Sequence, residues 1–193
     1  ATDFGDMTNA KHSGGYTNDD TRGVFISGLT ASGYTNVIDY ITMASTGNAT
    51  DFGDLHQGSG AYAPSKGVIS DNTTGVIAGG YDDTNYVARN YITKITIQTP
   101  GNSTDFGDLT TAHDNMLACS NGTTGLLIGG STNASNEILQ IAIGTPGNAT
   151  DFGDLVTSTL YNGSGMSGSP SGSGGGGGSS FWGGDRATYM AGY

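Results

Sequence analysis

One five-residue word occurs four times in the sequence, and its spacing constrains the fold more than any other feature. Thr-Asp-Phe-Gly-Asp stands at 2–6, 50–54, 104–108 and 150–154, each time after Ala or Ser. The first aspartates of successive copies are 48, 54 and 46 residues apart. A period close to 50 residues is typical of propellers, solenoids and other repeat arrays.

The composition favours short strands over helices. The chain has 193 residues, of which 35 are glycine, and only 12% are charged, against roughly 25% in an ordinary domain. Glycine adopts positive φ angles without steric cost, so it suits the tight turns between short strands. We therefore expect one all-β repeat domain over 1–193.

Each period contains four stretches with the pattern of a strand. The first is an apolar run closed by glycine, and the second is rich in β-branched and aromatic residues. The repeated word is the third, and a weaker stretch is the fourth. The apolar runs lie at 23–28, 75–80, 125–130 and 187–192; the second stretches at 36–43, 90–97 and 136–143; and examples of the fourth at 66–72 and 115–121. Turns at 44–48, 98–102 and 144–148 predict a hairpin between the second and third strands.

A sheet of four short strands cannot bury its own faces, so successive units must stack, and radial stacking produces a β-propeller. We expect about four four-stranded blades, with the apolar glycine-rich strand innermost and the fourth strand as an edge that tolerates polar residues. Whole units are predicted at 22–73, 74–123 and 124–168, and partial units at 1–21 and 185–193.

The two partial units are predicted to share one split blade. That blade would lack a second strand, which a neighbouring chain or a longer polypeptide would supply. Residues 168–184 are rich in glycine and serine and read as an insertion.

These motifs resemble a known family. An apolar strand that ends in Gly-Gly, at 79–80 and 129–130, with a period near 50, is similar to the kelch repeat of β-propellers. The longer phrase from this strand through the Gly-Asn turn to the repeated word resembles repeats in virion structural or tail-appendage proteins of marine phages. The resemblance implies a kelch-like propeller in a tail fibre, tail or capsid decoration.

Charge and cysteine content exclude several functions. The net charge is −11, with six Lys and Arg in all, and phosphate binding needs clustered cations, so nucleic acid is excluded as a partner. No apolar run approaches the roughly 20 residues of a membrane helix. Cys119 follows Met116, Leu117 and Ala118, which predicts a buried small hydrophobe rather than a reactive thiol.

The repeated word is predicted to be structural. A kinase metal motif would need a Gly-rich loop and a His-Arg-Asp loop, which the chain lacks. The word also resembles half of the Asp-box of sialidase propellers, where the Asp accepts backbone N–H bonds and the Gly takes a conformation that other residues resist. The predicted structural turn residues are Asp3, Gly5, Asp51, Gly53, Asp105, Gly107, Asp151 and Gly153.

No catalytic residue and no cofactor is predicted. Sialidase chemistry would need an arginine cluster, whereas Arg22 and Arg186 fall at equivalent repeat positions and only Arg89 remains. Paired carboxylates in a loop, such as Asp82 and Asp83, could offer oxygens to calcium.

The predicted function is non-enzymatic and extracellular. Loops at 29–35, 81–89 and 131–135 differ most between units, so they are the predicted surface for a host glycan or a neighbouring subunit, in a homo-oligomer. The candidate binding side chains are Tyr34, Tyr81, Tyr86 and Trp182. Two alternatives stay open: a bacterial adhesin or filament subunit, and a carbohydrate-active enzyme.

Overall fold

The computed structural model describes residues 2–56, 62–63, 67–82, 85–130, 135–157, 164–165 and 189–190. Within these ranges the chain consists of strands and turns and has no helix, so the expected all-β class is confirmed. It follows that no helix in the described part could cross a membrane. Trp182 and the Gly/Ser-rich insertion at 168–184 lie outside the described residues.

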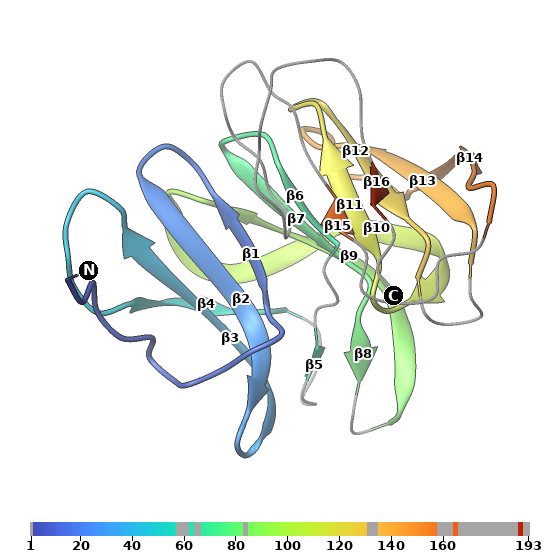
Figure 1. Ribbon diagram of the computed structural model, residues 1–193. Helices are drawn as coiled ribbons and strands as arrows, with labels where there is room; N and C mark the ends of the chain where they lie inside the picture. Colours follow the sequence, from blue (N-terminus) through green and yellow to red (C-terminus); the bar gives the residue numbers. More distant parts are fainter. Residues whose placement is uncertain are drawn as a thin grey trace.

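Three antiparallel sheets succeed one another along the chain (Figure 1). The first contains β1 (Gly15–Asn18), β2 (Arg22–Thr30), β3 (Gly33–Thr42) and β4 (Thr50–Asp54). The second contains β6 (Val68–Ser70), β7 (Thr74–Ala78), β9 (Val87–Thr96) and β10 (Thr99–His113), extended by β5 (Tyr62–Ala63) and β8 (Tyr81–Asp82). The third contains β11 (Leu117–Ser120), β12 (Thr124–Ile128), β13 (Glu137–Ala142) and β14 (Thr150–Asp154). A short pair, β15 (Ser164–Gly165) and β16 (Tyr189–Met190), forms a separate sheet.

The order of strands within each sheet differs from the expected one. The apolar glycine-rich strand (β2, β7 or β12) is the second strand of its sheet and not the innermost. The weaker stretch pairs with the apolar strand that follows it and forms one edge, while the repeated word forms the other. These first edge strands contact one another from sheet to sheet, β1 with β6 and β6 with β11. Every residue of β6 and β11 is therefore buried, whereas a polar edge was expected.

The predicted split blade is absent from the described pairings. Residues 3–6 belong to no strand, and β1 pairs with β2 within the first sheet. β16, which falls inside the predicted apolar run at 187–192, pairs with β15. No closed sheet forms in the described part of the chain. The copy of the word at 2–6 pairs with no strand, whereas the other three copies pair with β3, β9 and β13.

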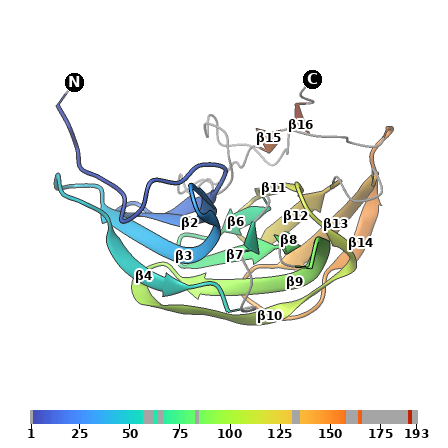
Figure 2. The same cartoon turned by 90° about the horizontal axis from the view of Figure 1, so that it is seen from below.

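Each gap between neighbouring sheets is filled by one hydrophobic core. In Figure 2 the three sheets follow an arc, with β4, β10 and β14 along its outer side. The first core joins the first and second sheets and includes Ile26, Phe52 and Ile95. The second core joins the second and third sheets and includes Ile69, Phe106 and Ile141. Most of the buried apolar surface therefore lies between units, as stacking repeats require.

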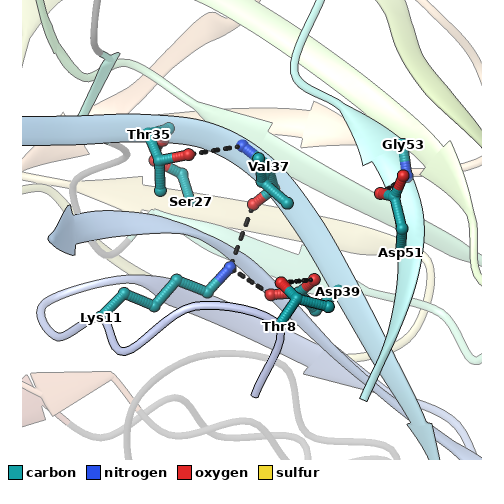
Figure 3. A network of polar contacts seen from close by, with 8 residues as sticks. All are labelled: Thr8, Lys11, Ser27, Thr35, Val37, Asp39, Asp51 and Gly53. Carbon is teal, nitrogen blue, oxygen red and sulfur yellow. Dashed lines mark hydrogen bonds and ion pairs between the residues drawn. The ribbon is translucent and has the colours of Figure 1, made fainter.

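The segment before β1 covers part of the first sheet and is anchored by a buried ion pair. Lys11 Nζ lies 2.7 Å from Asp39 Oδ2 on β3, and the two side chains are only 5% and 0% exposed. Lys11 also donates to the Val37 carbonyl at 3.1 Å, and the Thr8 hydroxyl donates to Asp39 Oδ1 at 2.6 Å (Figure 3). The position of Asp39 in the ladder is taken by Leu139 in the third sheet, where a neighbouring sheet covers it. The Lys11–Asp39 pair therefore lies between the N-terminal segment and the face of the first sheet that this segment covers.

Candidate functional site

In its second, third and fourth copies the repeated word lies in an edge strand and contains a β-bulge at its phenylalanine. Ile38 pairs with Gly53 and Asp39 with Asp51, so Phe52 between them has no cross-strand partner. The same irregularity leaves out Phe106 in β10 and Phe152 in β14. A bulge redirects the side chain of the extra residue. Phe52 and Phe106 each enter the core shared with the next sheet and are 3% exposed.

The aspartate before the bulge binds the glycine after it. The Gly N–H donates to the carboxylate two residues earlier in three copies, from Gly5 to Asp3 (3.1 Å), Gly53 to Asp51 (3.0 Å) and Gly153 to Asp151 (2.9 Å). The four glycines, including Gly107 beside Asp105, have φ between +139° and +153°. Other residues rarely adopt this conformation. In the second, third and fourth copies the predicted turn residues therefore lie in the strand at its bulge, and not in the hairpin turn before it.

The same glycine also receives the turn of the next unit. A Cβ placed on Gly5, Gly53 or Gly107 would meet the backbone of Gly47, Gly101 or Gly147 at 2.3, 2.5 and 2.3 Å. The two chains can approach this closely only because the position has no side chain. We call this contact between one unit's word and the next unit's Gly-Asn turn the joint.

An asparagine completes each joint. The second Asp of the word donates its N–H to the turn Asn of the next unit, from Asp6 to Asn48 (3.0 Å), Asp54 to Asn102 (2.9 Å) and Asp108 to Asn148 (3.0 Å). Backbone bonds flank it at 2.8 Å, from Ala49 N to the Asp6 carbonyl and from Ala149 N to the Asp108 carbonyl. One geometry therefore recurs at three joints along the chain.

A second repeated word was missed in the sequence. The turn from the first to the second strand of each sheet reads [Asp/Asn]-x-Thr-x-Gly, beginning at Asp19, Asp71 and Asn121. Its first side chain accepts two backbone N–H bonds, for example from Thr21 (2.8 Å) and Arg22 (2.7 Å) to Asp19. Burial raises the pKa of Asp19, but hydrogen bonds from Gln98, Thr21 and Arg22 outweigh it and hold the pKa below its ordinary value. Its spacing, again near 50 residues, is the signal that would have revealed it.

The predicted aromatic residues lie on hairpins that project from one side of the sheets. Tyr34 is half-buried at the tip of the β2–β3 hairpin, and Tyr81 is half-buried in β8. Tyr86, at the β8–β9 turn, is 76% exposed. Both hairpins extend downward in Figure 1, and β5 lies between them in contact with β2, β3 and β8. We call these two hairpins the rim.

Ionisable groups near the rim bind one another. Asp82 accepts hydrogen bonds from the Asn85 backbone N–H (3.0 Å) and side chain (2.9 Å) and forms an ion pair with Arg89. The hydrogen bonds from Asn85 and Arg89 hold the pKa of Asp82 far below its usual range. Asp83 lies outside the described residues, and those described contain no group of three His, Cys, Asp or Glu that could hold a metal ion. Calcium binding at Asp82 and Asp83 therefore stays a prediction.

The described arginines serve the packing of strands. The guanidinium of Arg22 stacks 4.2 Å above the centre of the Tyr40 ring and donates to the Ile97 carbonyl of the second sheet at 2.9 Å. Arg89 is engaged by Asp82 on the β8–β9 hairpin. Cys119 is 3% exposed, and burial raises the pKa of its thiol, as expected of a core cysteine. Arg186 lies outside the described residues.

Neither protein-family models nor curated protein sequences provide a match to this chain. Its candidate sites therefore rest on the geometry described above.

Proposed function

We propose that this chain is a non-enzymatic building block of an extracellular assembly, a phage tail fibre, tail or capsid decoration, with a kelch-like propeller arrangement of its sheets. In this role the stacked sheets form a rigid body, and the rim hairpins bind a host-surface glycan or a neighbouring subunit. The observation that carries the proposal is the contrast between constant joints and variable hairpins. One joint recurs three times with matching distances, whereas the hairpins beyond it differ in every unit.

A rigid support with variable loops is a common design for binding proteins. The joints and the two cores between sheets fix the support. Tyr86 supplies a large amphipathic surface at low entropic cost, and its 76% exposure leaves most of the ring in contact with solvent. Arg22 and Arg89 are engaged in packing, which favours binding over arginine-dependent glycosidase chemistry.

Binding to surface polysaccharides of host bacteria tests the proposal. We expect the chain to bind at least one such glycan, and Tyr86→Ala to weaken the binding about tenfold, a loss of about 1.4 kcal/mol. The matched control is Tyr16→Ala on β1, a tyrosine that is 40% exposed away from the rim. Equal weakening by both substitutions would contradict a rim site, and release of sugar products would favour the enzyme alternative.

A further inference from the structure

We propose that the word at 150–154, on the outer edge of the third sheet, binds the Gly-Asn turn at 47–48 of a second copy of this chain, so that copies join head to tail. The inference deepens the proposed role as an assembly subunit and rests on it. It concerns the joint surface and not the rim.

The last copy of the word lacks the contacts that the second and third copies make. Phe152 is 57% exposed, whereas Phe52 and Phe106 are each 3% exposed. A Cβ on Gly153 would meet no atom within 4 Å, while the equivalent atom on Gly107 would meet Gly147 at 2.3 Å. The word at 151–154 thus has the conformation of a joint, with φ of +146° at Gly153, but no described turn lies against it.

A cleft of about 360 Å³ lies on the same sheet and is lined in part by Thr124, Gln140 and Thr150. By ladder position, Thr124 and Gln140 correspond to Arg22 and Tyr40 of the first sheet. There the next unit occupies the space, since Arg22 donates to the Ile97 carbonyl and Tyr40 packs against the core that contains Ile97. The cleft adjoins the word through Thr150, and its residues Thr124 and Gln140 lie at strand positions that the next unit covers in the first sheet.

The structure also indicates what covers such a surface. At all three joints the partner is a Gly-Asn turn, at 47–48, 101–102 and 147–148. The turns at 101–102 and 147–148 are held by words that lie in sheets. The turn at 47–48 is held by residues 3–6, which belong to no strand and leave Phe4 37% exposed. Replacing residues 3–6 as the partner of this turn would therefore break no strand pairing.

The replacement is chemically exact in sequence, because residues 1–6 and 149–154 are both Ala-Thr-Asp-Phe-Gly-Asp. The N-terminal word makes three hydrogen bonds to this turn, Gly47 N to the Phe4 carbonyl (2.8 Å), Ala49 N to the Asp6 carbonyl (2.8 Å) and Asp6 N to Asn48 Oδ1 (3.0 Å). Residues 151–154 of a second copy can form the same three bonds and also bury Phe152. The exchange therefore conserves hydrogen bonds and gains apolar burial.

A contact between two different surfaces of one chain is heterologous, so it repeats until it closes a ring or extends a filament. In the isolated chain the N-terminal word competes for the turn, which keeps the association weak. The net charge of −11 adds repulsion between copies, so the association strengthens as salt screens it.

One substitution placed at two equivalent glycines tests the proposal in the full chain. Gly5→Val puts a side chain where the Cβ already meets Gly47 O at 2.3 Å, so it expels the chain's own word and frees the turn. We expect about tenfold tighter self-association in sedimentation equilibrium. Gly153→Val has the same starting φ of +146° and blocks the word that enters from the second copy, so we expect self-association to fall about tenfold.

Phe152→Glu provides an independent test, since this exposed side chain contributes little to folding. Combined with Gly5→Val it should return the chain to a monomer, whereas the control Thr110→Glu, which adds the same charge at an exposed position of β10 outside the rim, should not. Persistent monomer for Gly5→Val up to high protein concentration, or association that survives Phe152→Glu, would overturn the proposal. The two proposals concern different surfaces, glycan binding at Tyr86 on the rim and self-association at the word at 150–154. Absence of glycan binding in a chain that self-associates as expected would contradict only the proposed function. Glycan binding without the expected self-association would contradict only this inference.

Discussion

The glycines at 5, 53 and 107 matter because they have no Cβ, which allows the backbone of the next unit's turn to approach closely. At Gly107 a side chain would occupy the place of the Gly147 carbonyl, and the φ angle of +153° already disfavours one. The neighbouring Asp108 then uses its backbone N–H, and not its carboxylate, to bind Asn148. The function of this residue pair is therefore to let two backbones touch.

Gly107→Ala should destabilise the chain by about 3 kcal/mol, because it combines backbone strain with a steric clash at the joint. Urea unfolding followed by circular dichroism measures the change. Gly144→Ala is the control, since a Cβ there meets no atom within 4 Å, and we expect a change within about 0.5 kcal/mol. Similar losses at both positions would argue against the close approach as the cause.

At the scale of elements, the segment before β1 covers the face of the first sheet that corresponds to the face by which the third sheet packs on the second. It uses a buried charge pair where the third sheet uses a hydrophobic contact, with Asp39 at the ladder position of Leu139. Buried pairs of this kind specify one arrangement more than they stabilise it, as removal of a single partner leaves a buried charge.

Lys11→Ala should therefore cost about 3–5 kcal/mol in unfolding free energy, as the Asp39 carboxylate stays buried without its cation. The double variant Lys11→Met/Asp39→Leu should recover most of that loss, because it replaces the pair with the apolar solution seen at Leu139. A double-mutant cycle from chemical denaturation measures both. Additive losses in the double variant would show that the pair does not act as a unit.

Much of the element pattern follows from local sequence. Glycine-bounded apolar runs and β-branched stretches predict β2, β3, β7, β9, β12 and β13 because strand formation there depends on neighbours in sequence. The role of Asn48 at the joint does not follow from local sequence, because its side chain binds Asp6, 42 residues away. Local reasoning assigns such an Asn to its own turn. The burial of β6 and β11 escapes prediction for the same reason, because it depends on contacts between edge strands of successive sheets.

At the scale of the whole molecule, the first and second sheets each bury one face against the sheet that follows. In both of these sheets the phenylalanine of the word packs into the hydrophobic core between two sheets, and the residues on the other side of that core come from the next sheet. The same residue type at the same repeat position should therefore contribute very differently along the chain.

Phe52→Ala should cost about 3–5 kcal/mol by leaving a cavity between two sheets, whereas Phe152→Ala should cost under about 1 kcal/mol because the ring is 57% exposed. Thermal unfolding of the two variants side by side provides the comparison. Equal shifts in Tm would mean that the third sheet is covered in solution as fully as the other two.

The differences of 48, 54 and 46 residues between copies of the word leave the joint unchanged. The extra residues of the longest interval lie between the word and β7, in the segment that contains β5, and in the β8–β9 hairpin. A gene segment that encodes one unit can therefore be duplicated, lost or exchanged without rewriting the contacts on either side of it. Hairpins can change length and sequence by recombination while the stack remains intact. A chain built this way can acquire new surfaces faster than it acquires new folds.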